Sequence, residues 1–359
     1  MSSMTGKNIK ISVFGQSHSD AVGVVIDSLP AGFTVDTDKI NAFMTRRAPI
    51  EKHLSSGRKE KDRPEILSGL VNNTTCGAPL CAVIKNTDAR PDDYTEFKDC
   101  PRPSHADFAA FVKHNGHNDV SGGGHFSGRL TAPLCFAGAV CMQILESRNI
   151  HIKAHIYSIK EIKDTPFDFV NITSEDIASK QFPVIDDNAG EIMQEAILLA
   201  KERNDSVGGI IECAVTGIPA GYGDPMFDGI ENIIAKNIFS VPAVKGIEFG
   251  NGFLCTSLYG SKNNDEYTVK DGKIVTTTNN SGGITGGITN GMPVVFRVAL
   301  KPTPSIGTEQ NSVSISEMKD RKLTIGGRHD PCIVPRCVPV IEAVTAISVL
   351  DILENKNGY

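Results

Sequence analysis

"TAPLCFAGAVCMQILESRN", residues 131–149, is the stretch that decides the fold of this chain. It is apolar almost all round, whereas a helix on a protein surface shows one apolar stripe and one polar face. We therefore predict a central, fully buried helix. A helix without a solvent face needs packing layers on both of its sides, which indicates a layered fold with strands around it.

Working outward from this helix, alternating apolar patterns predict strands and 3.6-residue patterns predict helices. The strand patterns lie at residues 9–19, 23–33, 78–86, 150–159, 208–222 and 293–300. The helix patterns lie at residues 36–48, 188–205 and 228–239, and from about Val338 onward. Strands and helices do not alternate regularly enough for a doubly wound parallel sheet, so we expect an α+β arrangement.

Two pairs of segments repeat in the same order along the chain. "VVIDSLPAGFTVDTDKINAFM" (24–44) resembles "CAVTGIPAGYGDPMFDGIENII" (213–234), and "SGLVNNTTCGAPLCAVI" (68–84) resembles "SGGITGGITNGMPVVFRV" (281–298). This pattern predicts a single domain over 1–359 with two pseudo-symmetric halves, roughly 10–150 and 205–350. Chance similarity of turn residues is the alternative.

The charge balance and the cysteines limit the class of protein. The chain has 359 residues and a formal net charge of −6, with acidic and basic residues mixed. We expect no general attraction to nucleic acid or membranes, so an anionic ligand needs a local cluster of Arg and Lys. The nine cysteines show no C-x-x-C spacing, and no signal peptide is evident. We therefore expect a cytoplasmic protein with buried, reduced cysteines and no structural zinc.

Polar residues gather in five segments at strand ends or in glycine-rich turns, where sites are usually built. The five segments are "GQSHS" with Ser17 and His18; the basic stretch 45–63 with Arg46, Arg47, Lys52, Arg58, Lys59 and Lys61; "PRPSHADF" with Arg102 and His105; "SGGGHFSGR" with His125, Ser127 and Arg129; and "KPTPSIG" followed by "GGRHDPCIVPR" with Lys301, Arg328, His329, Asp330 and Arg336. Three successive glycines cost folding entropy, so we expect backbone there to take unusual dihedrals or approach something closely.

These residue types suit chemistry on a small anion. Arginines and lysines on separate loops can clamp carboxylates and a phosphate, and two histidines can act as general acids near neutral pH. Neither an H-E-x-x-H metal motif nor a G-x-S-x-G nucleophile elbow is present. Each segment also has a structural interpretation as a solvated basic loop, a satisfied histidine or a surface salt bridge. The residues alone predict a cytoplasmic enzyme for a phosphorylated small molecule and leave its reaction open.

The same five segments resemble, in the same order, the motifs of the chorismate synthase family. "PRPSHAD" is similar to the family's Arg-Pro-Gly-His-Ala-Asp, and "SGGGHFSGRLTA" to its Gly-Gly-Gly-Arg-Ser-Ser-Ala-Arg-Glu-Thr-Ala. "PAVKGIEFGNGF", "KPTPSI" and "GRHDPC" resemble its later segments, so the likeness covers nearly the whole chain. The resemblance implies a β-α-β sandwich with central helices between sheets, assembled as a homotetramer.

The resemblance also implies a specific reaction. Chorismate synthases are lyases that convert 5-enolpyruvylshikimate 3-phosphate to chorismate and phosphate by anti-1,4-elimination, in the shikimate pathway of aromatic amino-acid biosynthesis. They require reduced FMN without net redox change. We expect an external flavin reductant, and intrinsic use of NADPH stays open as the alternative.

Roles carry over to the matching positions of this sequence. His18 would donate a proton toward the departing phosphate, His105 would lie near flavin N1, and Asp330 would work with flavin N5. Ser17 and Ser127 would relay protons. The implied substrate-binding residues are Arg46, Arg47, Arg58, Arg129 and Arg336. The implied FMN-binding residues are His125, Phe126, Ser127, Pro242, Ala243, Gly286, Gly287, Lys301, Pro302, Thr303, Pro304, Ser305 and Arg328.

Several positions depart from the family's pattern. His125 and Phe126 stand where the family often has Arg and Ser, and Gln16 and Ser19 stand where it usually has Glu and Gly. The first pair removes one fixed positive charge and one hydroxyl from the loop assigned to the flavin. Two other functions remain as alternatives: an FMN-dependent oxidoreductase or flavin reductase on the same framework, and a non-enzymatic polyanion binder, which the acidic balance disfavours.

Overall fold

Helix α3 (Thr131–Glu146) lies at the centre of the fold, as its composition predicts. The computed structural model describes residues 3–48, 62–88, 91–172, 176–326 and 330–355. Thirteen of the sixteen residues of α3 are buried, and its main neighbour is α7 (Val334–Leu353). At Gly138 a methyl group would come 2.2 Å from Cβ of Ala343, so the two helices cross closer than any other residue at position 138 would permit.

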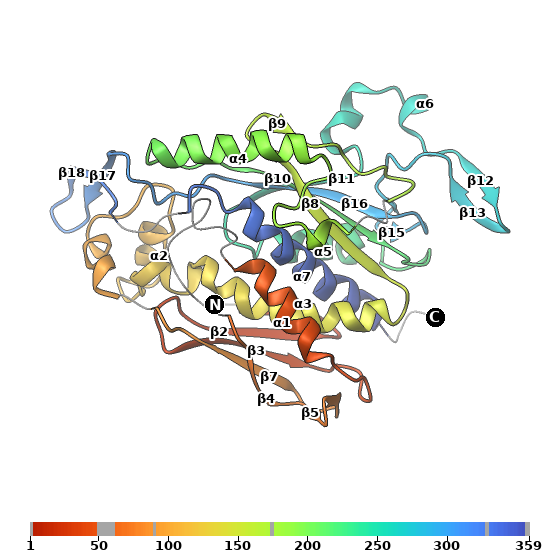
Figure 1. Ribbon diagram of the computed structural model, residues 1–359, viewed down its shortest axis with the longest axis horizontal. Helices are drawn as coiled ribbons and strands as arrows, with labels where there is room; N and C mark the ends of the chain where they lie inside the picture. Colours follow the sequence, from red (N-terminus) through yellow and green to blue (C-terminus); the bar gives the residue numbers. More distant parts are fainter. Residues whose placement is uncertain (1–2, 49–61, 89–90, 173–175, 327–329, 356–359) are drawn as a thin grey trace.

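Two five-stranded antiparallel sheets enclose this pair of helices (Figure 1). The first sheet has the order β1-β2-β3-β7-β4, with bounds Met4–Thr5, Lys10–Gly15, Ala21–Asp27, Leu80–Lys85 and Glu65–Ser68. The second has the order β11-β16-β10-β8-β9, with bounds Val244–Phe249, Val294–Leu300, Gly209–Thr216, His151–Ile159 and Ile162–Lys163. Neighbouring strands pair antiparallel in both sheets, as expected for a fold that is not doubly wound.

The helices between the sheets form the middle layer of the sandwich. Helix α3 packs on β2, β3 and β7 of the first sheet, and α7 packs on β8 and β10 of the second. Helix α1 (Thr37–Arg47) contacts both α3 and α7, and α5 (Ile230–Ile238) packs against α7. Helix α4 (Asp187–Glu202) lies on the outer face of the second sheet, against β8 and β9. The β-α-β sandwich predicted from the sequence is therefore confirmed.

The two sheets share one strand order. β2-β3-β7-β4 in the first sheet corresponds to β8-β10-β16-β11 in the second. In each case the chain runs from the second strand through a helix, α1 or α5, to the later strand, and a long helix, α3 or α7, follows. These matched orders support the two predicted halves, which stay a prediction.

Helix α7 begins four residues before the predicted start. Pro335 occupies its first turn, where a missing N–H leaves no hydrogen bond unmade, so this proline does not delay the helix. The polar residues inside α7 are satisfied: Thr345 Oγ1 donates to the Ile341 carbonyl (2.7 Å), and the Asp351 carboxylate accepts from the backbone N–H groups of Asn8 (2.6 Å) and Ile9 (2.8 Å). Asp351 thus ties the N-terminal strand to this helix.

Smaller elements decorate the sandwich. The remaining helices are α2 (Asp107–Lys113) and α6 (Gly260–Asn263), with 3-10 segments η1 (Pro91–Lys98), η2 (Ser121–Phe126), η3 (Gly128–Leu130), η4 (Ile177–Ser179), η5 (Met226–Asp228) and η6 (Gly252–Ser257). Two-stranded hairpins pair β5 (Leu70–Val71) with β6 (Thr74–Thr75), β12 (Tyr267–Lys270) with β13 (Lys273–Thr276), β14 (Ile284–Thr285) with β15 (Ile288–Thr289), and β17 (Gln310–Ser314) with β18 (Lys319–Leu323). The sequence patterns did not predict these hairpins.

The cysteines are unpaired, and most lie in the core. Six of the nine are buried, while Cys76 and Cys255 are exposed. Burial raises the pKa of Cys135 and of Cys337 to about 12, so these thiols stay neutral near pH 7. The prediction of small, buried, apolar cysteines therefore holds for these six positions and not for the two exposed ones.

Candidate active site

The glycine loop of η2 lies directly against the two predicted catalytic histidines. The φ values of its three glycines, Gly122, Gly123 and Gly124, are 59°, 87° and 53°. Residues that carry a side chain rarely adopt such backbone angles. A Cβ on Gly122 would come 2.3 Å from the ring of His18 and 2.6 Å from Oγ of Ser17, and a Cβ on Gly123 would come 3.0 Å from the ring of His105. The first two glycines are therefore needed where backbone meets these side chains.

Ser17 and His18 follow the end of β2. Ser17 is 1% exposed, and its backbone N–H donates to the Gly124 carbonyl at 3.0 Å, which fixes the strand end to the loop. The His18 ring packs against Tyr94, with 5.0 Å between the ring centroids. Both residues are thus held beside η2, as their sequence positions after a strand suggested.

His105 is oriented by a carboxylate. Its Nδ1 lies 2.6 Å from Oδ1 of Asp107, and Arg102 donates to both oxygens of the same carboxylate, from Nε at 2.7 Å and Nη2 at 2.8 Å. Burial would raise the pKa of Asp107, but hydrogen bonds from Arg102 and His105 lower it well below its usual range. The ionised Asp107 leaves Nε2 as the His105 nitrogen that faces the glycine loop.

The turn at 301–305 joins this segment from the second half of the chain. Lys301 Nζ donates to the Ser104 carbonyl at 2.5 Å, and Arg102 Nη1 donates to Ser305 Oγ at 3.4 Å. The backbone N–H of Lys301 donates to the Ala243 carbonyl at 3.0 Å, so Ala243, which has a φ of 74°, also lies here. Three of the predicted cofactor-binding residues are thereby brought beside His105.

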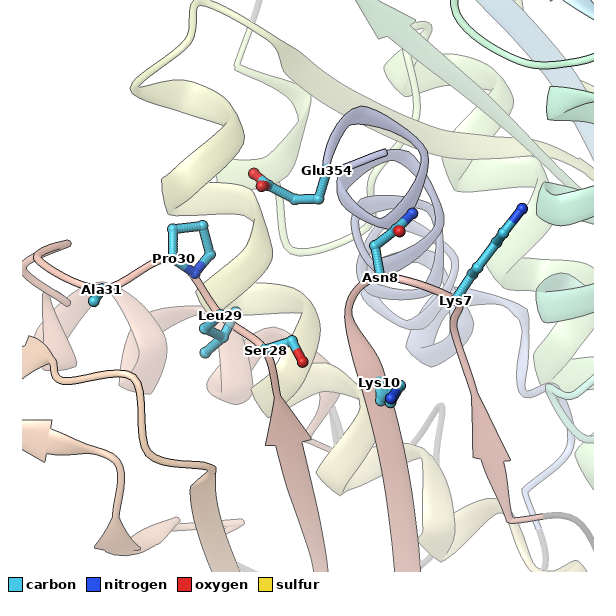
Figure 2. A pocket seen from close by; sticks show the side chains of 8 residues that line it. All are labelled: Lys7, Asn8, Lys10, Ser28, Leu29, Pro30, Ala31 and Glu354. Atoms are coloured by element: carbon cyan, nitrogen blue, oxygen red, sulfur yellow. The ribbon is translucent and has the colours of Figure 1, made fainter. Parts of the chain in front are cut away.

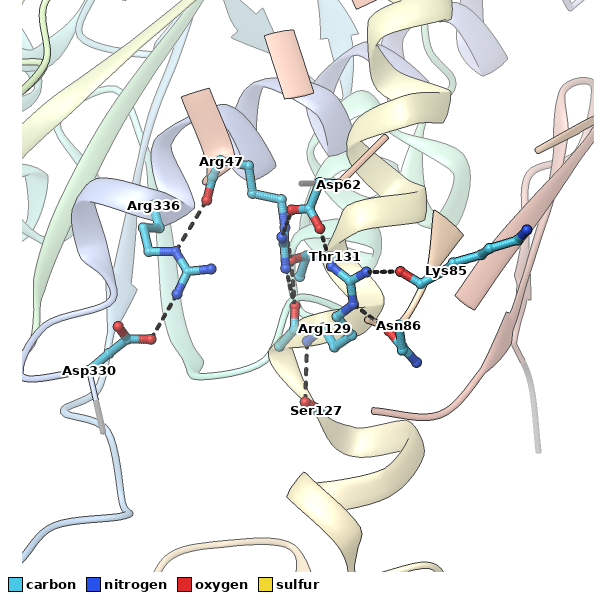
Figure 3. A network of polar contacts seen from close by, with 10 residues as sticks. Arg47, Asp62, Lys85, Asn86, Ser127, Arg129, Thr131, Asp330 and Arg336 are labelled. Carbon is cyan, nitrogen blue, oxygen red and sulfur yellow. Dashed lines mark hydrogen bonds and ion pairs between the residues drawn. The ribbon is translucent and has the colours of Figure 1, made fainter. Parts of the chain in front are cut away.

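A network of buried and half-buried side chains links five further predicted residues (Figure 3). Arg47, at the end of α1, and Arg129, in η3, are each 5% exposed, and both donate to the carboxylate of Asp62. Arg336 in α7 donates to the Arg47 carbonyl (3.1 Å) and to the carboxylate of Asp330 (2.9 Å). Ser127 Oγ accepts from the Arg129 backbone N–H at 3.2 Å. The pattern of separate basic segments therefore converges in space.

The described part of this network contains three arginines and two aspartates. Burial would raise the pKa of Asp62, but the charges of Arg47 and Arg129, with a smaller contribution from Arg336, lower it. Asp62 is therefore ionised at neutral pH. Arg47 and Arg129 also donate to neutral oxygens: Thr131 Oγ1 (2.9 Å), Gly128 O (2.9 Å), Asn86 Oδ1 (2.7 Å) and Lys85 O (3.2 Å).

Arg46 faces away from this network, although it precedes Arg47 directly. Its Nη1 and Nη2 donate to the two oxygens of Glu342 at 2.7 and 3.1 Å, inside the helical layer. Burial would lower the pKa of Arg46, but the Glu342 charge raises it above its ordinary value. Arg46, whose side chain is half-buried, therefore pairs with a different carboxylate from those that Arg47, Arg129 and Arg336 contact.

His125 and Phe126 differ in their surroundings. The ring of His125 is held at both nitrogens, with Nδ1 2.8 Å from the Gly15 carbonyl and Nε2 2.9 Å from Ser3 Oγ. It therefore fastens the N-terminal segment to the glycine loop. Phe126 is 41% exposed, and its ring lies 6.4 Å from that of His114.

Other predicted residues lie elsewhere or outside the described residues. Gly286 and Gly287 form the turn of the β14–β15 hairpin, and the Gly287 carbonyl accepts from the N–H of Ile230 at the start of α5 (2.9 Å). Pro242 precedes Ala243 and is half-buried. Within the 301–305 turn, the Thr303 carbonyl accepts from Ser206 Oγ at 2.7 Å. Arg58 and Arg328 lie outside the residues that the structure describes.

The sequence patterns missed three residues of the site. Asp62 lies in "KEKDR", which looks like a solvated run of mixed charge, so nothing marked it as a buried carboxylate. Asn86 follows a strand without any motif. Asp107 stands two residues after His105 inside a quoted motif, and this spacing is the one signal that could have identified it.

A pocket at the other end of the helical layer has a different character (Figure 2). Its volume is about 460 Å³, and it is lined by Lys7, Asn8, Lys10, Ser28, Leu29, Pro30, Ala31 and Glu354. Glu354 pairs with Arg148, and Lys7 lies 3.7 Å from Asp228. Two of its charged groups thus pair with neighbours, and none of the predicted site residues lines it.

The described residues contain no group of three or more His, Cys, Asp or Glu side chains placed to hold a metal ion. Residues 128–146 are long and apolar enough to cross a membrane, but 83% of that window is buried inside the protein, as expected for a core helix.

Comparison with known proteins gives one consistent result. The sequence pattern of the family described as chorismate synthase matches residues 9–353. A chorismate synthase of Lancefieldella parvula is 44% identical over 100% of this chain and 99% of its own length, and one of Thermococcus kodakarensis is 41% identical over 99% of each.

A solved structure agrees with the sequence comparison. The chain superposes on a crystal structure of chorismate synthase with a TM-score of 0.77 and 28% identity, covering 99% of this chain and 94% of the other. Fold, residue pattern and length therefore agree, and the chain belongs to the chorismate synthase family.

Proposed function

We propose that this chain catalyses the anti-1,4-elimination of phosphate from 5-enolpyruvylshikimate 3-phosphate to give chorismate, with reduced FMN. One observation carries the proposal: a single loop packs against Ser17, His18 and His105 through its glycines and continues into Ser127 and Arg129. Candidate proton donors and anion-binding groups are therefore fixed relative to one another by one rigid piece of backbone.

The residues around His105 fit a bound flavin. The hydroxyl of Thr303 is buried and has no hydrogen-bond partner among the described residues, which leaves a donor for a ligand. Burial and the nearby charge of Lys245 lower the pKa of Lys301. Reduced FMN, when bound, would be the source of electron density for the loss of phosphate. Lys301 to Ser305, Ala243 and His105 would hold it, with Pro242, Phe126, Ser127 and Arg328 as further candidates.

The chain's own groups would handle protons. His18 would donate toward the departing phosphate. His105, held by the ionised Asp107, would keep its Nε2 available near the flavin, since Nδ1 is engaged. Asp330, oriented by Arg336, would accept or hold a proton on the flavin side, and Ser17 and Ser127 would relay protons.

The arginine network would bind the substrate. The substrate carries two carboxylates and a phosphate, so a site with excess positive charge is required. Arg47, Arg129 and Arg336 form that site, with Arg58 as a further candidate. Arg46 differs from these members of the implied set because its carboxylate partner is Glu342 of α7, in the helical layer.

We also propose that copies of this chain assemble as a homotetramer. An arm of residues 251–281 extends from the second sheet and carries η6, α6 and the β12–β13 hairpin (Figure 1). Phe253, Tyr259 and Ile274 on this arm are 82%, 85% and 72% exposed. A two-stranded hairpin is marginally stable alone in water, so a covering surface is expected, and a second copy supplies one. Sedimentation should give four chains for the wild type and fewer for Tyr259→Asp.

The remaining assignments follow the family. We propose a cytoplasmic enzyme that takes reduced FMN from an external reductant and uses neither nucleic acid nor membrane. Intrinsic reduction of FMN by NADPH is the alternative, and stopped-flow absorbance of FMN mixed with enzyme and NADPH separates the two.

The decisive experiment is anaerobic. Protein, dithionite-reduced FMN and 5-enolpyruvylshikimate 3-phosphate are mixed, and phosphate release and chorismate absorbance are followed together. Equal amounts of both products without net flavin oxidation support the proposal. Hydride exchange with a nicotinamide cofactor and no chorismate would instead support the FMN-dependent oxidoreductase.

A further inference from the structure

His125 ties the glycine loop of η2 to two segments near the start of the chain. Its Nδ1 lies 2.8 Å from the Gly15 carbonyl, and its Nε2 lies 2.9 Å from Ser3 Oγ. Because a carbonyl oxygen can only accept, Nδ1 carries the proton and donates to Gly15. In the neutral ring Nε2 is then the acceptor, and the hydroxyl of Ser3 donates to it. Both ring nitrogens are therefore engaged within the protein.

The same loop meets the end of β2 at two further points. The backbone N–H of Ser17 donates to the Gly124 carbonyl at 3.0 Å, and a Cβ on Gly122 would lie 2.3 Å from the His18 ring. Successive loop residues thus meet successive residues of the strand end, from the imidazole contact to His18. A shift of the loop at the imidazole would therefore be passed along a short stretch of backbone to the His18 ring.

The Gly15 carbonyl is a fixed point for this contact. Gly15 pairs with Val22 of β3, and its φ of 97° lies in the region that residues with side chains rarely adopt. A Cβ at this position would come 2.4 Å from the Ala21 carbonyl oxygen, so the strand end is closely packed. The strand end therefore has little room to follow the loop, and His125 sets where the loop lies against it.

We propose that the side chain of His125 is a positioning residue, which holds the glycine loop in register with the end of β2 and so fixes the place of the His18 ring. The inference rests on the proposed function, in which His18 donates a proton toward the departing phosphate. His125 itself does not touch the substrate. Its ring nitrogens serve a backbone carbonyl and a hydroxyl of the chain, so this role differs from the flavin contact that the family resemblance implies for position 125.

Two amides separate the contributions of the two ring nitrogens. The amide nitrogen of asparagine is attached to Cγ, as Nδ1 of histidine is, so His125→Asn keeps a donor for the Gly15 carbonyl. The amide nitrogen of glutamine lies one carbon further out, near the place of Nε2, so His125→Gln loses that donor and can still reach Ser3. At saturating FMN and substrate, kcat should fall about 10–100-fold in His125→Gln and stay within about threefold of the wild type in His125→Asn.

Binding measurements show whether the loss is one of positioning. The dissociation constants for FMN and for 5-enolpyruvylshikimate 3-phosphate are measured with oxidised FMN, so that no turnover occurs. Both constants should change by less than about twofold in His125→Gln and in His125→Asn, because neither ligand contacts the imidazole nitrogens. A misplaced His18 lowers kcat without weakening either ligand, whereas general damage to the site would weaken both.

Two control variants separate the loop from the N-terminal segment. Ser3→Ala removes the partner of Nε2 and leaves the Gly15 contact. Thr5→Val removes a hydroxyl that donates to Asn237 Oδ1 of α5 at 2.6 Å. Both variants should lower the melting temperature, because each loses a hydrogen bond, and both should keep kcat within about twofold of the wild type. A loss of kcat in Ser3→Ala as large as in His125→Gln would assign the effect to the N-terminal segment and overturn the proposed role.

The remaining outcomes distinguish this inference from the proposed function. Wild-type kcat in a folded His125→Gln protein, or equal losses of kcat in His125→Gln and His125→Asn, overturns the positioning role and leaves the proposed function intact. A raised FMN dissociation constant with unchanged kcat at saturating FMN does the same. If the wild type forms no chorismate, both are overturned. If the glutamine variant does not fold, His125→Asn decides: wild-type kcat and FMN affinity support the role, and a large loss of kcat overturns it.

Discussion

Two buried charge clusters, one beside the glycine loop and one on the second sheet, look alike in burial and differ in their surroundings. Arg47, Asp62 and Arg129 beside the glycine loop carry two positive charges against one negative charge. The cluster on the second sheet pairs His155 and Arg297 with Asp164, Glu212 and Glu248. The comparison teaches that burial and ion pairing alone do not mark a site, because both clusters have them and only the first lies beside the glycine loop.

The cluster on the second sheet encloses the imidazole ring of His155. The His155 side chain is fully buried, with Nδ1 2.9 Å from Asp164 and Nε2 3.1 Å from Glu212. Arg297 Nε donates to the other oxygen of Glu212 at 2.8 Å, and Asp164 also accepts from the backbone N–H groups of Ile185 and Asp186. Burial alone would lower the pKa of His155, but hydrogen bonds to both carboxylates and their charges raise it.

The largest effect is expected at His18. His18→Ala should lower kcat by about 10²–10⁴-fold, the usual contribution of a general acid, while FMN binding and the melting temperature change little. Steady-state rates and flavin titration measure the two. Unchanged turnover would remove His18 from the chemistry and would leave the arginine network as the main mark of the site.

The second effect contrasts the two clusters directly. His155→Gln should destabilise the fold by about 3–5 kcal/mol, because it leaves buried carboxylates without their cation, yet kcat and KM should not change. Urea unfolding measures the loss. His151→Gln on the same strand is the control, since His151 is exposed, and it should cost less than about 0.5 kcal/mol. Loss of substrate affinity in His155→Gln would mean that the cluster on the second sheet also contributes to substrate binding.

The raised pKa of His155 gives this cluster a pH dependence. A group with a raised folded-state pKa stabilises fully below its unfolded value, about 6.5, and that contribution is lost as pH rises through the folded value. The urea midpoint of the wild type should therefore fall on the alkaline side of pH 6.5. His155→Gln should lack this slope, and retention of the slope would assign it to another group.

The third effect sharpens the role of the glycine loop. Gly122→Ala should lower kcat by about 10–100-fold, since the added methyl displaces the His18 ring. Gly128→Ala is the matched change, because its Cβ would meet nothing within 4 Å, and it should cost far less. Equal losses in both variants would mean that flexibility, and not the contact with His18, explains the glycines.

The smallest effect is expected at Phe126. Phe126→Ala should change stability by less than about 0.5 kcal/mol, because the side chain is 41% exposed. If the ring contacts FMN, the flavin dissociation constant should rise a few-fold, about 1 kcal/mol. Fluorescence titration measures this, and an unchanged constant would remove Phe126 from the cofactor site.

The fold was predictable where the composition of a single element indicates its surroundings. The composition of α3 was enough to predict a central buried helix, and the strand ends at Ser17 and His18 lie where their motif implied. Contacts between distant segments were not predictable. Ser3 and Gly15 contact His125 from more than 100 residues away in the sequence. Asp62 lies in a charged stretch that is typical of a solvated loop, but in the structure it pairs with Arg47 and Arg129.

The close crossing of α3 and α7 has a consequence for biosynthesis. Val334 follows Glu146 by 188 positions, so at about 5–20 residues per second a ribosome needs roughly 10–40 s to supply the partner of α3. During that interval the most apolar helix of the nascent chain has the first sheet and α1 to cover it, and α7 is still missing. The yield of this protein in a foreign host should therefore depend mainly on chaperones that bind the unfolded chain and release it slowly. The stability of the folded state should matter less.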